Sequence, residues 1–317
     1  MKLGDFYKHV IKNGLTSDPR TRKEIEDEMK KRRKEYNALK AVDKKYFDKE
    51  KLEHPYDDTR ILYGDKDRSV STIMVGIDMG GEELLTANFL NEKGAGIDLA
   101  LSHHPSGKAL AGLFNVMHVQ TDLLVKQGLS LEIAKSLMKE RIAEVSRRLL
   151  PSNHERSVDI ARLINMPLMS AHTPADNHVA SFLQNMFDRK KPKKAGDIVQ
   201  MLKTIPEYQD GMRKGVGPKL IAGKETSKAG KVFVDMTGGT EGSKRIFARL
   251  SQAGVGTLVA MHLSDEHYNA AKSEFMNLII AGHIASDNLG LNLLFDKLSK
   301  KQILNIIPCS GFVRVKR

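Results

Sequence analysis

Two stretches of the chain follow the same plan and decide its fold. The first is STIMVGIDMGGEELLTANFLNEKGAGIDLALSHHPSG, from Ser71 to Gly107, and the second is KVFVDMTGGTEGSKRIFARLSQAGVGTLVAMHLSDEH, from Lys231 to His267. Each begins with a short apolar segment ending in Asp-Met, followed by a glycine turn, an amphipathic segment, a second glycine signal and another apolar segment. This order predicts two strand–helix–strand units with parallel strands.

The similarity continues downstream of both units. PLMSAHTPADNHVASFLQNMF begins at Pro167, and LIIAGHIASDNLGLNLLFDKL begins at Leu278. Both stretches pass from an apolar segment through His-x-x-x-Asp-Asn into a helix with an apolar stripe. Because the two matches occur in the same order after the same unit, they indicate an internal duplication.

The chain is therefore predicted to be an α/β protein of two duplicated lobes with mainly parallel βαβ units. Its 317 residues agree with a prior of two domains. The predicted divisions are a charged helical N-terminal extension (1–68), a first lobe with a helical insertion near 121–164 (69–190), a basic linker with loops (191–230) and a second lobe (231–317).

The composition excludes several classes of protein. With 40% hydrophobic and 28% charged residues, the chain is an ordinary globular sequence rather than a disordered one. Its single cysteine, Cys309, excludes an intramolecular disulfide framework and cysteine-rich zinc modules. No apolar run approaches the length of a membrane span, and the amino terminus lacks the apolar core of a secretory signal. We therefore expect a soluble, cytoplasmic protein without a membrane segment.

The net charge of +12 is spread over the chain, with a dense run, RKKPKK, from Arg189 to Lys194. A basic run around a proline is typical of a solvated linker. The alternative is contact with nucleic acid, although neither interleaved aromatic residues nor a finger motif accompanies the run. Diffuse charge of this kind predicts only weak, salt-sensitive nucleic-acid binding.

Histidines follow the predicted strands, at the sheet edge where ligands gather in parallel sheets. His103 and His104 are adjacent after a strand; the alternative interpretation is a pair of partly exposed loop histidines. A spacing of four separates the histidine and aspartate of each later motif, so one helical turn would place both on one face. Asp176 could instead cap its helix.

Five of these side chains together supply three imidazoles and two carboxylates: His103, His104, Asp176, His283 and Asp287. This donor set suits two divalent ions that activate a bridging water. Because such donors serve Zn, Fe, Mn and Ni alike, the sequence predicts two divalent metal ions per chain without specifying the metal. His262 is equivalent to His103 in the second unit, and we interpret it as a hydrogen-bonded histidine at a strand end.

At these residues the chain resembles the Nif-three-like family, a group of dinuclear-metal proteins also described as GTP cyclohydrolase type II-like. The resemblance rests on LSHHPSG at 101–107, AHTPAD at 171–176 and AGHIASDNLG at 281–290, and it covers about 71–317. It implies a Nif-three-like fold with two facing lobes, and two metals bound by the five donors. It also implies a homo-oligomer, a hexamer of dimers in a ring.

The resemblance extends to neighbouring residues and has two departures. It implies that His172 is a lining residue or extra ligand and that His267 lies near the cleft; Asp78 and Thr173 are further expected to line the site. The family usually has glutamate at the position of Asp287, so bridging of both metals from that position stays open. The family motif HTNLD is HTPAD here, with a stiffening proline.

The predicted function is a metal-dependent hydrolase that acts on a nucleotide or phosphoester through a metal-activated water. The alternative is a non-enzymatic, ring-forming scaffold or nucleic-acid-associated regulator with structural metals. The diffuse positive charge and an N-terminal extension that matches no motif favour this alternative.

Overall fold

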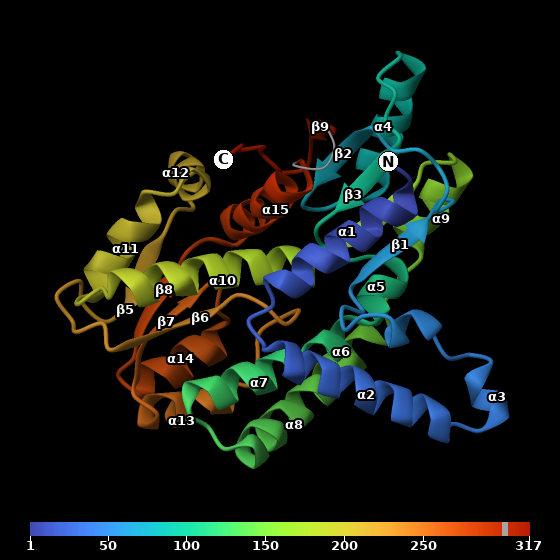
Figure 1. The fold of residues 1–317 in the computed structure, drawn as a ribbon. Coiled ribbons are helices and arrows are strands. Elements are labelled where there is room, and N and C mark those ends of the chain that lie inside the picture. The colour runs from blue at the N-terminus through green and yellow to red at the C-terminus, as the bar shows by residue number, and fades with distance from the viewer. Residues whose placement is uncertain (300–303) are drawn as a thin grey trace.

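The computed structural model describes residues 1–299 and 304–317 and contains two sheets with helices packed on them (Figure 1). The strand order is β1-β4-β3-β2-β9 in the first sheet and β5-β8-β7-β6 in the second. The strands are β1 (Thr59–Tyr63), β2 (Thr72–Gly76), β3 (Leu99–Ser102), β4 (Leu168–Ala171), β5 (Lys219–Ala222), β6 (Lys231–Asp235), β7 (Val255–Ala260), β8 (Asn277–Ile280) and β9 (Asn305–Pro308).

Helices connect the strands and precede the first sheet. The α-helices are α1 (Leu3–Thr16), α2 (Arg22–Ala38), α3 (Ala41–Lys44), α4 (Gly81–Glu92), α5 (Gly107–Ala111), α6 (Leu113–Val116), α7 (His118–Gln127), α8 (Leu131–Leu149), α9 (Arg156–Leu163), α10 (Thr173–Lys190), α11 (Ala195–Lys203), α12 (Pro206–Arg213), α13 (Phe247–Gln252), α14 (Asp265–Ser273) and α15 (His283–Ser299). Short 3-10 helices cover Lys49–Leu52 and Lys244–Ile246. None of the described helices combines the length and apolarity that crossing a membrane requires.

The predicted architecture of two duplicated α/β lobes is confirmed by the strand pairing. β2, β3 and β4 are parallel neighbours in the first sheet, as are β6, β7 and β8 in the second. Each sheet also has one antiparallel edge strand, β1 or β5. The two sheets therefore share one topology. The first sheet has one additional strand, β9, which runs parallel to β2.

The strand pairing crosses the predicted divisions at three places. β1 lies in the predicted extension (1–68) but pairs with β4. β5 lies in the predicted linker (191–230) but pairs with β8, and β9 lies in the predicted second lobe (231–317) but joins the first sheet. These strands have four or five residues and are only partly buried, so their hydrophobic pattern is short and weak.

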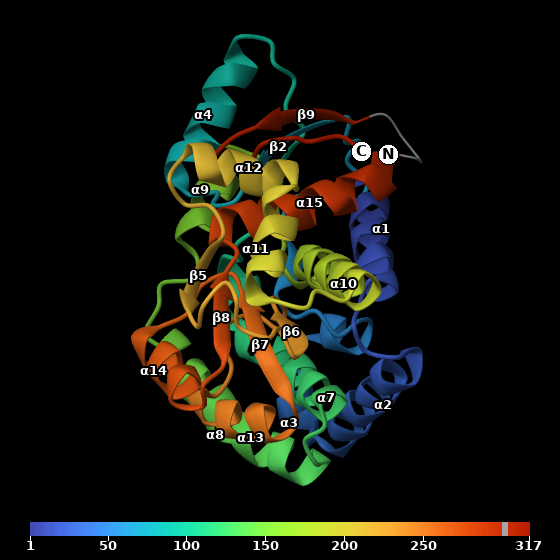
Figure 2. The ribbon, with the colours of Figure 1, turned by 90° about the vertical axis from the view of Figure 1, so that its left-hand side faces the viewer.

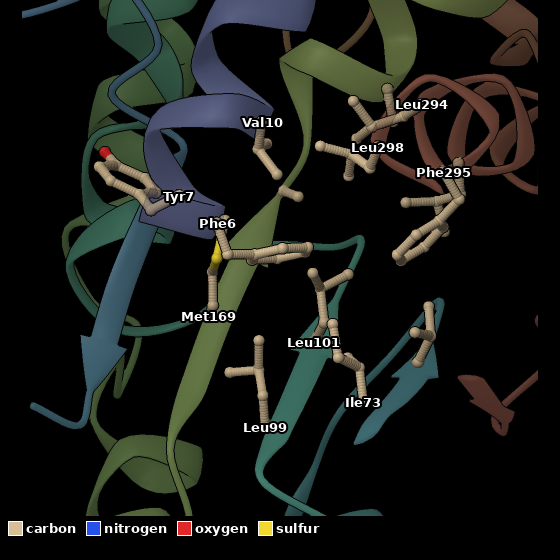
Figure 3. Packing of buried hydrophobic residues seen from close by; sticks show 14 of the residues in the cluster. Phe6, Tyr7, Val10, Ile73, Leu99, Leu101, Met169, Leu294, Phe295 and Leu298 are labelled. Atoms are coloured by element: carbon tan, nitrogen blue, oxygen red, sulfur yellow. The ribbon is translucent and has the colours of Figure 1, made fainter. Parts of the chain in front are cut away.

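The first helix of the predicted extension is part of the core. Leu3, Phe6 and Val10 of α1 are fully buried and belong to one core with Leu99 and Met169 of the first sheet. Figure 3 shows Phe6 and Val10 above these strands. α2, by contrast, exposes most of its side chains. The amino-terminal segment thus begins as a structural element of the first lobe and becomes a solvated helix only after residue 21.

The long helices α10 and α15 are exchanged between the lobes. α10 follows β4 of the first sheet, but its Val179 and Leu183 pack with the second sheet. α15 follows β8 of the second sheet, but its Leu291 and Leu294 pack with the first. Figures 1 and 2 show the two helices side by side in both views. Each lobe therefore supplies the helix that covers the other lobe's sheet.

The predicted helical insertion near 121–164 contains α8, α9 and most of α7. Ser130 begins α8 as its N-cap, with its hydroxyl accepting a hydrogen bond from the Ile133 amide at 3.3 Å. Met138 and Val145 of α8 pack with Leu258 of β7 in a core on the second sheet. The insertion of the first lobe therefore stabilises the second.

The close crossing of α10 and α15 predicts the effect of a Gly290→Ala substitution. A Cβ added at residue 290 would clash with the carbonyl oxygen of Ala175. This oxygen belongs to the backbone of α10, so it cannot move aside as a side chain could. We expect overpacking to lower the free energy of unfolding by about 1–3 kcal/mol in urea denaturation, despite the higher helix propensity of alanine. Gly211→Ala in α12 is the matched control, because its nearest neighbours would lie at 3.4 Å. Equal effects of the two substitutions would contradict this interpretation.

Candidate metal centre

Both repeats have the same order of strand, histidine and helix, and this order brings the candidate ligands close together. His103 and His104 follow β3, while Asp176 lies in the first turn of α10, directly after β4. His283 begins α15 and Asp287 follows one turn later. Because α10 and α15 pack together, ligands from both lobes meet between them.

Asp287 lies at the centre of one group of histidines. Its Oδ1 is 3.4 Å from Nε2 of His103, and its Oδ2 is 3.5 Å from Nε2 of His104. Nε2 of His283 is also 3.5 Å from Oδ2. The two oxygens of this one carboxylate therefore face different imidazoles.

Asp176 forms a second group with the same central histidine. Its Oδ1 is 3.4 Å from Nε2 of His103, and its Oδ2 is 3.8 Å from Nε2 of His172. Two sets of ligand atoms are each close enough together to hold a metal ion: His103 with His172 and Asp176, and His103 with His104 and Asp287. Because both sets contain His103, they are adjacent.

The other ring nitrogen, Nδ1, of three histidines is occupied by a protein oxygen. Nδ1 of His103 is 3.2 Å from the Ala171 carbonyl oxygen, and Nδ1 of His104 is 2.8 Å from Oδ1 of Asp78. Nδ1 of His172 is 2.9 Å from Oδ2 of Asp58. This arrangement fixes the tautomer with Nε2 free and turns Nε2 toward the centre, as in protein metal sites.

Asp58 is a residue of the site that the sequence reasoning missed. It is fully buried, and its Oδ2 also accepts a hydrogen bond from the Thr173 hydroxyl at 2.6 Å. Burial by itself would raise the pKa of Asp58, but hydrogen bonds from His172 and Thr173 hold the pKa below its usual value. The Asp57-Asp58 pair carries no motif and lies far along the chain from His172, so no local signal identifies it.

Three of the four carboxylate oxygens of Asp176 and Asp287 are buried without a hydrogen-bond donor among the described residues. Oδ1 of Asp176 and both oxygens of Asp287 have no hydrogen-bond partner among the described residues. A buried carboxylate without donors is costly, and buried charges normally pair or bind metals. The donor set of imidazole nitrogens and unpaired carboxylate oxygens therefore fits a divalent cation.

The two buried carboxylates have opposite pKa shifts. Burial raises the pKa of Asp176 to about 8, with Asp287 adding to the rise and His103 opposing it. Burial would also raise the pKa of Asp287, but the imidazoles of His103 and His104 outweigh it and hold the pKa well below its usual range. Strong shifts caused by burial and a specific charged partner are typical of functional sites.

A small cavity of about 70 Å³ adjoins this cluster on the side of the second lobe. His172 and Asp176 line it from the first lobe, and His267 lines it from the second. Nε2 of His267 is 2.9 Å from the Gly242 carbonyl oxygen and Nδ1 is 2.6 Å from the Ser264 hydroxyl, so both nitrogens are occupied. Of the four residues expected to line the site, His172 and His267 line the cavity. Asp78 and Thr173 do not line it; they contact His104 and Asp58 instead.

The structure thus defines an α/β protein of two interlocked, duplicated lobes with a histidine–aspartate cluster between them. The sequence matches no protein-family model and no curated protein. A NIF3 superfamily protein from Sphaerobacter thermophilus is similar in structure, with a TM-score of 0.69 and 25% identity over 80% of this chain and 91% of that one. The fold is that of the NIF3 superfamily, which confirms the predicted resemblance.

Two further solved structures are more distant. Reduced HcgD from Methanocaldococcus jannaschii has a TM-score of 0.48 at 16% identity, covering 80% of this chain and 88% of that one. A Bacillus cereus protein related to NIF3 has a TM-score of 0.42 at 12% identity, covering 81% of this chain and 93% of that one.

Proposed function

We propose that the protein binds two divalent metal ions at this centre and is a metal-dependent hydrolase acting on a phosphoester or nucleotide. The observation that carries the proposal is the set of buried carboxylate oxygens without donors, which face imidazole Nε2 atoms. The residues that would hold the ions are His103, His104, Asp176, His283 and Asp287, with His172 as an additional ligand. When bound, two such ions supply Lewis acidity and lower the pKa of a bound water.

The protein's own residues would contribute orientation and charge. The two oxygens of Asp287 face different histidines, which supports the proposal that this carboxylate would help to hold both ions. Its side chain is one methylene shorter than that of glutamate. Asp58 and Asp78 hold the rings of His172 and His104. The ring-like hexamer of dimers and the cytoplasmic location stay predictions.

Metal analysis and turnover assays test the proposal together. Protein purified without chelators is expected to carry two divalent ions per chain by inductively coupled plasma mass spectrometry. It is also expected to release phosphate from p-nitrophenyl phosphate or from GTP, and to stop doing so after chelation. Two bound ions without turnover, combined with unfolding on chelation, would support structural metals instead, and absence of bound ions would exclude the proposal.

The buried contact between Asp58 and His172 predicts that Asp58 influences metal affinity without touching the metal. In Asp58→Asn the residue keeps its shape but loses the charged acceptor that orients the His172 ring through Nδ1, so metal affinity is expected to fall by about tenfold or more. Titration of chelator-stripped protein with Mn²⁺ followed by calorimetry measures the change. Asp65→Asn, an exposed turn residue of the same lobe, is the control and is expected to bind like the wild type. Wild-type affinity in both variants would remove Asp58 from the site.

A further inference from the structure

A second carboxylate–histidine pair lies across the cavity from the cluster, in the other lobe. Nδ1 of His262 is 3.2 Å from Oε1 of Glu241. That oxygen also accepts a hydrogen bond from the Ser264 amide at 2.6 Å, and the Glu241 side chain is only 14% exposed. Glu241 is therefore held in place and fixes one edge of the His262 ring.

The pair resembles an arrangement in the first lobe, although its two residues are not the repeat equivalents of that first pair. There, Asp78 follows the first strand of the repeat and holds Nδ1 of His104, which follows the second strand. In the second lobe, Glu241 follows β6 and holds Nδ1 of His262, which follows β7. Holding Nδ1 leaves Nε2 on the opposite edge of the ring as the available nitrogen.

His262 lies close enough to take part in events at the cluster without being one of its ligands. Its ring centroid is 4.8 Å from that of His283, and the residue lines the cavity. His283 lies 3.5 Å from Asp287, whereas none of the ion pairs of the two cluster carboxylates among the described residues involves His262. The side chain of His262 is 50% exposed. A residue in this position contacts what enters the cavity.

The size of the cavity limits what can enter. Its volume of about 70 Å³ is far below the roughly 300–1,000 Å³ of pockets that enclose drug-sized ligands. By the same measure one water molecule needs about 10–15 Å³, so the space suits a group of only a few heavy atoms. One phosphoryl group is of this size, whereas a purine base is not.

The charge of the cavity sets a second condition. Four carboxylates line it, from Asp176, Asp235, Glu241 and Asp287. Without bound cations this wall repels anions. Two divalent ions would balance the four negative charges and would give an anion two cations to contact.

We propose that His262, oriented by Glu241, is the second lobe's contact to a single tetrahedral oxyanion bound at the loaded centre, and that any remaining part of the ligand stays outside the cavity. This inference rests on the proposed function, because the anion requires the metals. It assigns a positioning role to Glu241 and a ligand-binding role to His262, and it narrows the substrate class to compounds with an accessible terminal phosphoryl group.

Calorimetric titration of Mn²⁺-loaded protein with inorganic phosphate tests the contact. His262→Ala is expected to bind Mn²⁺ with wild-type stoichiometry but to weaken phosphate binding by about tenfold or more, as for loss of a hydrogen bond to a charged group. Glu241→Gln is expected to weaken it less, and His262→Gln, which keeps a polar atom near the Nε2 position, to restore part of it. His9→Ala, on the exposed side of α1, is the control.

The outcomes separate this inference from the proposed function. Failure of the wild type to bind Mn²⁺ would overturn both. Normal Mn²⁺ binding with the same phosphate affinity in the wild type and His262→Ala would overturn the inference alone. Titration with guanosine and with guanosine monophosphate tests the size argument: only the monophosphate is expected to bind, and equal binding of guanosine would contradict a phosphoryl-sized site.

Discussion

Asp287→Asn is expected to abolish divalent metal binding at the centre. The substitution keeps the size of the side chain but replaces an anionic oxygen, facing the Nε2 atoms of His104 and His283, by a neutral amide group. Both oxygens of Asp287 lack hydrogen-bond donors in the described protein, and only the neighbouring imidazoles face their charge, so the carboxylate is available to a cation bound among these rings. Removing a residue that only orients a metal ligand lowers metal affinity by roughly 10–100-fold. Removing a ligand itself should lower the affinity further, so we expect Mn²⁺ affinity to fall by more than about 100-fold.

The control for this experiment is Asp159→Asn on α9. Asp159 is a half-exposed residue that pairs with Arg162 and lies outside the centre. Its substitution is expected to leave the stoichiometry and affinity of Mn²⁺ unchanged. Circular dichroism of the metal-free variants shows whether both are folded. A folded Asp287→Asn protein that still binds two ions with wild-type affinity would remove this carboxylate from the ligand set.

Arg20→Met is expected to be the most destabilising substitution outside the centre. Arg20 and Asp18 form an ion pair at 2.9 Å in which both side chains are fully buried, and Arg20 also contacts Glu28. Methionine would leave the Asp18 carboxylate buried with only the Tyr56 hydroxyl as a neutral side-chain donor, at 2.8 Å. Removing one partner of a buried pair typically costs about 3–5 kcal/mol, and we expect this loss in the free energy of unfolding.

Arg22→Met, two residues away, is the matched control. Its side chain is 93% exposed and pairs with Glu26 on the surface of α2. Surface pairs of this kind contribute at most about 1 kcal/mol, so its urea-denaturation midpoint should be close to that of the wild type. Similar midpoints for Arg20→Met and Arg22→Met would show that the buried network does not stabilise the fold.

This network gives the amino-terminal segment a role that composition alone does not reveal. The Tyr56 hydroxyl, bonded to Asp18, also accepts a hydrogen bond from Nδ2 of Asn177 at 3.2 Å. Oδ1 of Asn177 accepts a hydrogen bond from the Thr237 hydroxyl at 2.7 Å. The segment between α1 and α2, which contains Asp18, is therefore linked to both lobes through Asn177. Asn177 directly follows the candidate ligand Asp176.

The repeated motifs predict the fold well because repetition is a long-range signal. A strand ending at His103 and a His-x-x-x-Asp spacing at 172–176 and 283–287 are readable in the sequence, and the topology brings these ends together. The same reasoning cannot find Asp58, whose contact with His172 joins residues 114 positions apart. Nor does it find β1 and β5, because antiparallel edge strands of this length carry little periodicity.

The role of His262 illustrates a different limit. The duplication predicts that it corresponds to His103, and its interpretation as a hydrogen-bonded strand-end histidine is compatible with the contact to Glu241. Its position beside His283, however, depends on how the lobes are placed against each other. Periodicity within one lobe contains no information about that placement.

The exchange of α10 and α15 has a consequence for how the chain is made. During synthesis the first sheet emerges with one apolar face that α1 covers only in part and that α15 will later complete. Its edge strand β9 does not exist until residue 308 has been added. The first lobe therefore cannot finish folding ahead of the second, as independent domains do on the ribosome. Formation of the first lobe should therefore wait for β9, and chains that end before residue 305 should expose apolar surface that attracts chaperones.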